Sequence, residues 1–324
     1  MTLETNTLNK LSVVIPVFRS QLILPQLHDR LETVLSALPF DYEIIYVEDC
    51  GGDNSWQVIC QLAAANPHVH GIKLSKNFGQ HCALLCGIRA AAGDIIVNID
   101  DDLQNPPEEI PKLIARLAEG YDVVYGTPAN LSHGLLRNYA SSITKLGLQS
   151  AIGVENASKA SAYRAFRSKL RDTFASYSSS VVNVDVLLTW GTSRFSSVTV
   201  RQDQRMLGNS GYTLLKLFNH AMNMMTGFST LPLQLASLLG FIFASMGFMV
   251  LFYVLIRYLI SGSSVPGFTF IASIISIFSG VQMFALGIFG EYLARMHLKN
   301  MGRPPYIVET SITKPHPEFS GTDS

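Results

Sequence analysis

Three adjacent carboxylates, Asp100, Asp101 and Asp102, are the residues of this chain best suited to chemistry, and they directly follow an apolar run. Neighbouring carboxylates repel one another unless a cation or hydrogen-bond donors offset their charge. Carboxylate oxygens are also the ligands that hard divalent cations such as Mg²⁺ and Mn²⁺ take from proteins. The triplet therefore predicts a divalent-metal site, and a solvated acidic turn without a ligand is the alternative.

The elements that would carry this triplet alternate along the first third of the chain. Short apolar runs typical of buried strands are separated by stretches with helical apolar spacing. The expected strands are 11–17, 42–47, 69–74 and 94–99, and the expected helices are 22–38, 55–65 and 80–92. This alternation predicts an α/β fold with a doubly wound, mostly parallel sheet.

Polar residues follow every one of these strands, at the edge where ligands of doubly wound sheets bind. They are Arg19 and Ser20, Glu48 and Asp49, Lys76 and Asn77, and the three aspartates. We therefore expect these side chains to gather around one site.

Two long uncharged stretches predict membrane-spanning helices. Residues 234–256 and 268–290 contain no charged residue, in a chain with 48% hydrophobic and only 15% charged residues. Each stretch is long enough to cross a hydrocarbon core of roughly 30 Å as a helix. A buried helical hairpin in a soluble protein is the alternative, which the length of both stretches disfavours.

The charges around these stretches predict the orientation of the chain. The linker 261–267 is uncharged, whereas basic residues precede the first stretch and follow the second. They are Arg201, Arg205 and Lys216 before it, and Arg295, Lys299 and Arg303 after it. Cytoplasmic loops carry the excess of Lys and Arg, so both termini and the large N-terminal part are expected in the cytoplasm. The formal net charge is zero, which argues against a nucleic-acid partner.

The chain is expected to divide into four parts. Residues 1–210 form a cytosolic domain, 211–232 an amphipathic juxtamembrane helix, 233–292 a two-helix membrane hairpin and 293–324 a cytosolic tail. A second amphipathic stretch, 135–147, lies within the first part. Helices with one apolar and one basic face can lie on an anionic bilayer surface, and packing against the sheet is the alternative.

Several segments also resemble a known family. They are VVIPVFRS, YEIIYVEDC and DDDLQNPPEEIP, together with LGIFGEYLARM near the end of the second uncharged stretch. They resemble the inverting family-2 glycosyltransferases of the GT-A fold and, within them, the polyprenyl-phosphate glycosyltransferases. The resemblance covers nearly the whole chain. It implies a metal-dependent enzyme that transfers a sugar from a nucleotide sugar, expected to be a UDP-sugar, onto undecaprenyl phosphate with inversion.

The same resemblance implies where the protein works and with which partners. It places a multi-pass enzyme in the bacterial inner membrane, acting at the cytoplasmic face in cell-envelope glycan modification, with Mg²⁺ or Mn²⁺ as cofactor. It also implies a homo-oligomer, expected to be a tetramer, and a lipid-linked sugar flippase as a candidate partner.

Residue roles follow from the matched segments. The expected nucleotide-binding residues are Pro16, Val17, Asp49, Asn77, Asp100 and Asp101. Asp100 and Asp102 resemble the D-x-D pair of the family and are the expected metal ligands, and Asp102 is also expected to be catalytic. Arg205 and Ser210 match the segment that contacts the acceptor phosphate, and Arg205 is expected to assist catalysis.

Three departures from the family pattern remove charged groups. Arg19-Ser20 stands where relatives have Asn-Glu, Gly211 where they have a phosphate-binding Lys, and Ala157-Ser158 where a catalytic Asp is expected. The acceptor chemistry does not require that Asp as a base. A phosphomonoester, with a second pKa around 6, is largely dianionic at neutral pH and supplies its own nucleophilic oxygen.

These departures leave alternatives open. Asp185 could take over part of the duty of the missing Asp, and an ordinary helix-end or buried paired Asp is the competing interpretation. A catalytically impaired scaffold or flippase partner would also lose catalytic groups, but it would have no reason to keep Asp49, Asp100 and Asp102 at strand ends. A processive polysaccharide synthase would need a Q-x-x-R-W type signature, which the sequence lacks.

Overall fold

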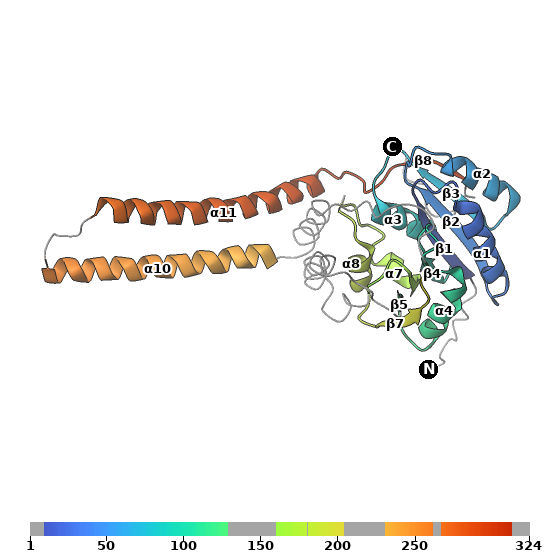
Figure 1. The fold of residues 1–324 in the computed structure, drawn as a ribbon, viewed down its shortest axis with the longest axis horizontal. Helices are drawn as coiled ribbons and strands as arrows, with labels where there is room; N and C mark the ends of the chain where they lie inside the picture. The colour runs from blue at the N-terminus through green and yellow to red at the C-terminus, as the bar shows by residue number, and fades with distance from the viewer. Residues whose placement is uncertain (1–9, 129–159, 180, 204–230, 262–266, 313–324) are drawn as a thin grey trace.

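The fold combines one large sheet, flanked by helices, with a pair of long helices that project from it (Figure 1). The structure, a computed structural model, describes residues 10–128, 160–179, 181–203, 231–261 and 267–312. The expected amphipathic stretch 135–147 and nearly all of 211–232 fall outside the described residues.

Within the described residues, the sheet has eight strands in the order β7-β5-β6-β4-β1-β2-β3-β8. The strands are β1 Lys10–Val17, β2 Asp41–Glu48, β3 Val69–Leu74, β4 Ile95–Asn98, β5 Val123–Pro128, β6 Arg164–Arg167, β7 Phe195–Val200 and β8 Val308–Ile312. Strand β1 pairs in parallel with β2 and β4, and β2 pairs in parallel with β3. Only β6 and β8 run antiparallel to their neighbours. The expected mostly parallel sheet is confirmed.

Helices cover both faces of this sheet, which is why its central strands β1, β2 and β4 are mostly apolar and buried. The helices of the domain are α1 Leu24–Ser36, α2 Ser55–Ala65, α3 Gln80–Ala90, the 3₁₀ turn η1 Pro107–Glu109, α4 Ile110–Ala118, α7 Lys169–Asp172 and α8 Val184–Thr189. One apolar core joins α1, α2 and α4 to the sheet, and a second joins α3, α7 and α8 to the other face.

The two long helices are α10 Leu231–Ser261 and α11 Phe268–Asn300. Both are long and apolar enough to cross a membrane, and the expected spans 234–256 and 268–290 fall within them. Only 6% of Leu233–Val250 and none of Ile277–His297 is buried, whereas the core helix of a soluble protein would be mostly covered. The helices run side by side (Figure 1), with an edge-to-face contact of Phe243 and Phe278.

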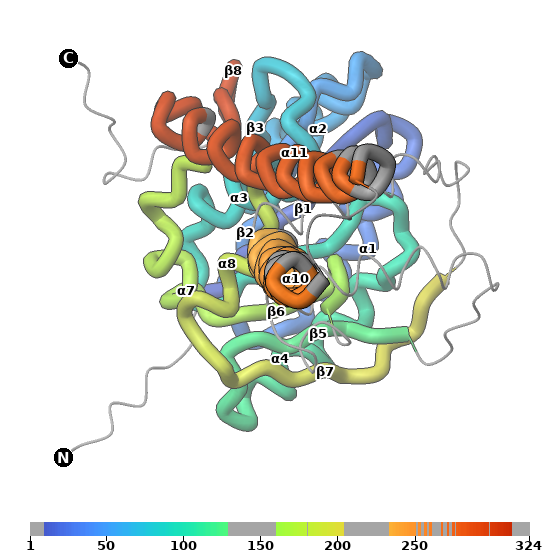
Figure 2. The backbone as a smooth tube through the Cα atoms, turned by 90° about the vertical axis from the view of Figure 1, so that its left-hand side faces the viewer, coloured from blue at the N-terminus to red at the C-terminus, as the bar shows by residue number. Residues whose placement is uncertain are grey.

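The chain beyond α11 returns to the sheet, which the sequence did not lead us to expect. Strand β8 adds to the outer edge of β3, and the end of α11 lies near this edge in Figure 2. Between them, the Tyr306 ring lies 5.7 Å from the guanidinium carbon of Arg89 on α3. Part of the expected tail therefore ties the second long helix to the domain.

Helix α3 approaches the strands very closely at Gly87. A Cβ atom at this position would lie 2.4 Å from Cγ1 of Val14 and 3.0 Å from Cγ2 of Val47. Those two valines belong to β1 and β2. The missing side chain therefore sets the spacing between α3 and the strand ends that carry the polar residues.

We predict that Gly87→Val destabilises the domain by about 2 kcal/mol, since overpacking a filled core forces side chains or backbone to shift. Urea unfolding of the detergent-solubilised protein, followed by tryptophan fluorescence, measures this change. Ala90→Val is the control, because it also places a valine in the same helix, but at an exposed position. A loss at Gly87 no larger than that at Ala90 would show that the close approach does not limit stability.

Candidate active site

The loops that follow β1, β2, β3 and β4 meet in one cavity. Its lining consists of Pro16, Val17, Phe18, Asp49, Asn77, Gly79, Gln80, Asp100, Asp101 and Asp102. All the described residues that we expected to bind nucleotide or metal are in this set. They meet because the parallel register aligns the carboxyl ends of the strands: Val17 lies opposite Glu48, and Val14 lies opposite Asn98.

Asp49, at the end of β2, fixes the loop that leads into α3. Its two carboxylate oxygens accept hydrogen bonds from the backbone N–H groups of Phe78, at 2.7 Å, and Gly79, at 2.8 Å. Gly79 has a φ of +94°, which residues with a side chain rarely adopt. Burial raises the pKa of Asp49, while these two donors oppose that rise. Each oxygen keeps a second lone pair that could accept from a ligand.

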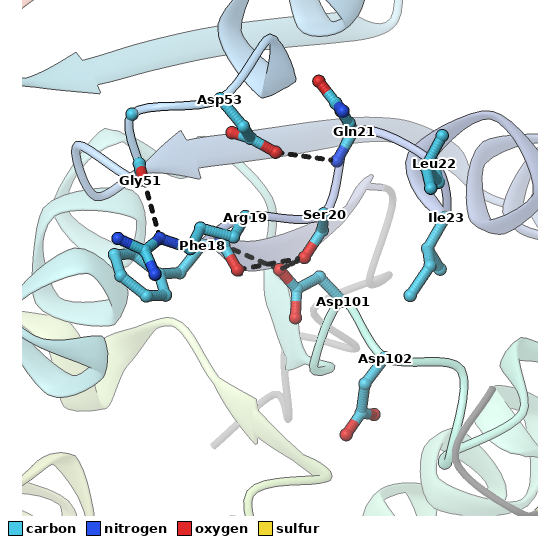
Figure 3. A pocket seen from close by; sticks show the side chains of 11 residues that line it. Phe18, Arg19, Ser20, Gln21, Leu22, Ile23, Gly51, Asp53, Asp101 and Asp102 are labelled. Atoms are coloured by element: carbon cyan, nitrogen blue, oxygen red, sulfur yellow. Dashed lines mark hydrogen bonds between the residues drawn. The ribbon is translucent and has the colours of Figure 1, made fainter. Parts of the chain in front are cut away.

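The three adjacent aspartates have different partners. Asp101 accepts hydrogen bonds from the backbone N–H of Phe18, at 2.9 Å, and from the hydroxyl of Ser20, so it is held by the loop after β1. Figure 3 shows Asp102 pointing away from that loop. Asp100 accepts a hydrogen bond of 2.7 Å from the side-chain amide of Gln80. Asp102 accepts a 3.1 Å hydrogen bond from the backbone N–H of Gln104, so all three carboxylates are engaged by the protein.

Burial and mutual repulsion raise the pKa values of these aspartates. Burial, followed by the charges of Asp102 and Asp101, raises the pKa of Asp100 to about 6, although Arg164 and Gln80 act in the opposite direction. Burial also raises the pKa of Asp101, against the hydrogen bonds from Ser20 and Phe18. A bound cation would favour the ionised form of both groups.

The donor set fits a divalent cation that a ligand helps to hold. Among the described residues, no three His, Cys, Asp or Glu side chains form a complete protein-only metal site. Mg²⁺ is often bound by only one or two carboxylates, with substrate phosphates and water completing its shell. Asp100 and Asp102 match that arrangement, because both line the same cavity.

A second cavity of about 450 Å³ adjoins the first and shares Phe18, Asp101 and Asp102 with it. The Nε atom of Arg19 donates a 2.9 Å hydrogen bond to the carbonyl of Gly51 beside it, as Figure 3 shows. The Arg19-Ser20 departure therefore has a structural consequence. Arg19 joins the loops after β1 and β2, and Ser20 joins the loop after β1 to Asp101.

Asp185 is not among the residues that line these two cavities. It is buried at the start of α8, where its Oδ1 atom accepts a 3.0 Å hydrogen bond from the Tyr125 hydroxyl and forms an ion pair with Arg164. This geometry matches the interpretation of Asp185 as a buried paired residue. Arg205, Ser210 and the Ala157-Ser158 departure fall outside the described residues.

Sequence reasoning missed Gln80 and Arg164, whereas Ser20 was expected at the site as a polar residue that follows the first strand. Gln80 opens α3 and could have been found from its place after the third expected strand. Arg164 lies 62 residues beyond the triplet's last member, Asp102, in a strand that the sequence pattern did not indicate. Only the pairing of β6 with β4 brings it near Asp100.

Comparisons with known proteins agree with this geometry. Over residues 12–187, more than half of the chain, the sequence matches the model of glycosyl transferase family 2. The chain is 34% identical over 315 residues to an undecaprenyl-phosphate 4-deoxy-4-formamido-L-arabinose transferase of Yersinia enterocolitica, with 95% of each chain covered. It is 36% identical over 311 residues to the transferase of the same name from Yersinia pestis, with 94% of each covered.

Among solved structures, the fold resembles glucosyl-3-phosphoglycerate synthase from Mycobacterium tuberculosis, determined with Mn²⁺, UDP-glucose and phosphoglyceric acid. The TM-score is 0.50 at 19% identity, and the match covers 67% of this chain and 78% of that chain. The expected fold and the resemblance drawn from the sequence are both confirmed. The protein is a glycosyltransferase, and its chain belongs to glycosyl transferase family 2.

Proposed function

We propose that this enzyme transfers a sugar from a nucleotide sugar onto undecaprenyl phosphate at the membrane surface, with inversion. The observation that carries the proposal is the end-to-end similarity to undecaprenyl-phosphate sugar transferases, which covers the domain and both long helices. The site agrees with it, because a cavity lined by carboxylates suits a metal-bound diphosphate donor. We infer a UDP-sugar as the donor.

Different residues of the cavity are proposed to bind different parts of the donor. Asp49 holds the loop that carries Asn77, and its spare lone pairs face a cavity that also contains Pro16 and Val17. The nucleotide base is proposed to lie there. Asp100 and Asp102 would hold Mg²⁺ or Mn²⁺, which when bound would offset the charge of the departing diphosphate.

The transfer itself makes and breaks one bond at the anomeric carbon. An acceptor phosphate oxygen forms the new bond while the bond from that carbon to the donor diphosphate breaks, so that a nucleoside diphosphate leaves and the configuration inverts. Because the acceptor is a dianion near neutral pH, no side chain has to remove a proton from it. Arg205 and Ser210 are proposed to bind the acceptor phosphate, since an arginine suits bidentate contact with phosphate.

The membrane arrangement belongs to the same proposal. Helices α10 and α11 span the bacterial inner membrane, with the domain and both termini in the cytoplasm, where nucleotide sugars are available. The proposal also includes a homo-oligomer, expected to be a tetramer. A lipid-linked sugar flippase is the proposed partner. The domain boundaries at residues 210, 232 and 292 are proposed with it.

We predict that membranes containing this enzyme transfer label from a nucleotide sugar into a lipid that extracts into organic solvent and is labile to mild acid. A panel of radiolabelled UDP-sugars, tested with and without added undecaprenyl phosphate, measures the transfer and identifies the sugar. Membranes from cells that lack the protein are the control. If no donor labels a lipid although the protein is folded and binds nucleotide, the result would favour a catalytically impaired scaffold over an active enzyme.

A second prediction concerns the metal. Asp102→Asn should lower transfer by about 10² or more, because it removes a charged oxygen ligand from a cation that neutralises the leaving group. Chelation of the wild type should have the same effect. Mn²⁺ binding should weaken as the pH falls through about 6, the pKa of Asp100, because protonation removes the charge that holds the cation.

The matched control for that prediction is Asp172→Asn. It makes the same chemical change at an exposed position, where the carboxylate pairs only loosely with Arg171 at 3.6 Å. Calorimetric titration with Mn²⁺ in the presence of UDP measures binding, and the lipid assay measures transfer. Full activity after chelation, or the same loss in both variants, would show that Asp102 does not act as a metal ligand.

The third prediction of this section concerns orientation. A cysteine introduced at Ser263, between the two helices, should react with an impermeant thiol reagent added outside spheroplasts, and one at Ser320 should not, because the uncharged linker faces away from the cytoplasm. Cys50 is an internal control, since it is exposed on the domain and should react only after lysis. The opposite labelling pattern would place the domain on the side without nucleotide sugar.

A further inference from the structure

Within the described part of the chain, every non-glycine residue with a left-handed backbone lies in a loop of the candidate active site. Arg19, Cys50 and Leu103 have φ values of 59°, 52° and 58°, and they follow β1, β2 and β4. Residues with a side chain rarely adopt this conformation, and such strain clusters in loops that bind ligands. The family pattern has Asn at the position of Arg19, and Asn adopts a left-handed backbone more readily. The strain indicates that the arginine side chain serves more than the turn.

The loops after β1 and β2 run side by side and bring Arg19 next to the proposed base site. The backbone N–H of Asp49 donates a 2.9 Å hydrogen bond to the carbonyl of Val17. Two residues further along both loops, Nε of Arg19 donates a 2.9 Å hydrogen bond to the carbonyl of Gly51. Gly51 allows this approach, because a Cβ atom there would lie 2.7 Å from the backbone nitrogen of Arg19. Arg19 therefore lies beside the segment that begins with Asp49.

The guanidinium group of Arg19 is held on one side and open on the other. Its Nε atom is bound to Gly51, as Figure 3 shows, and its central carbon lies 5.1 Å from the centroid of the Phe18 ring. Neither Nη atom has a hydrogen-bond partner within the described residues. A guanidinium carries its N–H donors in a rigid fork. The donors on the two Nη atoms therefore remain available to a ligand in the cavity that Arg19 lines.

The surroundings of Arg19 favour a nucleotide base over a phosphate as that ligand. Three carboxylates, those of Asp53, Asp101 and Asp102, line the same cavity. They oppose a phosphate, whereas the carbonyl oxygen of a base carries no net charge. Phe18 is 45% exposed and lines both this cavity and the one that contains Asp49. An exposed aromatic ring at this boundary suits a flat base.

We infer that Arg19 is a specificity-determining residue of the donor site, whose Nη groups donate hydrogen bonds to a carbonyl oxygen of the base and so select uracil over cytosine. The inference rests on the proposed function and deepens it. Cytosine carries an amino group where uracil carries one of its two carbonyl oxygens. An amino group cannot accept from a guanidinium, so the arginine would lose its partner. A site built to hydrogen-bond one substrate group discriminates strongly against an analogue that lacks it.

The deciding variant is Arg19→Asn, which restores the residue of the family pattern and suits the left-handed turn. Titration calorimetry of the full-length enzyme in detergent, with Mn²⁺ present, measures the binding of UDP, CDP and inorganic pyrophosphate. The affinity for UDP should fall by about tenfold or more, the loss expected when a hydrogen bond to a charged group is removed. The affinities for CDP and pyrophosphate should stay unchanged, because neither ligand offers the carbonyl that Arg19 contacts.

A second variant, Arg19→Lys, separates the fork of donors from the positive charge. Lysine keeps the charge but cannot hold the Gly51 carbonyl and a base at once, since it lacks the planar fork. Its preference for UDP over CDP should therefore resemble that of Arg19→Asn. Thermal unfolding identifies folded variants, and Arg19→Lys carries the test if Arg19→Asn does not fold. Full UDP affinity in the lysine variant, or equal losses for pyrophosphate and UDP in the asparagine variant, would overturn the inference.

Arg194→Asn is the control, because it makes the same substitution at another exposed arginine. Arg194 pairs with Asp122 at 3.0 Å, just before β5 begins, at the end of the sheet opposite to the site. Its UDP affinity should match that of the wild type, and a loss as large as that of Arg19→Asn would contradict the inference. A wild type that binds CDP as tightly as UDP would also contradict it. A wild type that prefers UDP but labels no lipid would contradict the proposed function alone.

Discussion

Electrostatic repulsion among three carboxylates at the end of β4 is the constraint on which the site is built. The protein offsets it with several partners that come from different loops. The loop after β1 binds Asp101 through Phe18 and Ser20, Gln80 at the start of α3 binds Asp100, and Arg164 acts from β6. The loop after β1 and strand β6 belong to the two neighbours of β4 in the sheet, whereas Gln80 comes from the segment after β3. The site therefore depends on the order of the strands, and the partial neutralisation leaves a site that favours a cation.

The segment just after the triplet serves mainly to hold it. The carbonyl of Pro106 accepts a hydrogen bond from the Tyr163 hydroxyl, and Glu108 pairs with Arg30 on α1. Contacts with Tyr163 and with Arg30 on α1 therefore fix the segment that follows the triplet. A carboxylate placed within a fraction of an ångström is useful only if its backbone is equally fixed, which explains why the longest piece of the family resemblance, DDDLQNPPEEIP, extends well past the residues that face the cavity.

A lipid acceptor imposes a second requirement, which is to hold the site close to a bilayer. The two long helices are exposed and apolar, and α11 does not end as a free tail. The chain beyond it pairs with β3 and packs Tyr306 against Arg89 of α3, the helix whose first residue binds Asp100. The membrane anchor and the donor site are consequently connected through a single helix. Because the acceptor phosphate is already a dianion, the protein has to position it more than it has to transfer a proton.

Several features of this protein follow from the sequence alone. Apolar periodicity located the first four strands nearly to the residue and indicated both long helices, because burial on both faces or in lipid demands continuous apolar runs. Helices α10 and α11 extend past the uncharged spans, to Ser261 and Asn300. Position after those strands identified Asp49, Asn77 and the aspartates, because parallel strands align their carboxyl ends. Short or exposed elements such as β6 and β8 carried no such signal. Their places depend on pairing between segments far apart in the chain. Only the tertiary structure revealed that Arg164 on β6 and Asp185 on α8 form a buried ion pair, since such a pair leaves no periodic trace in the sequence.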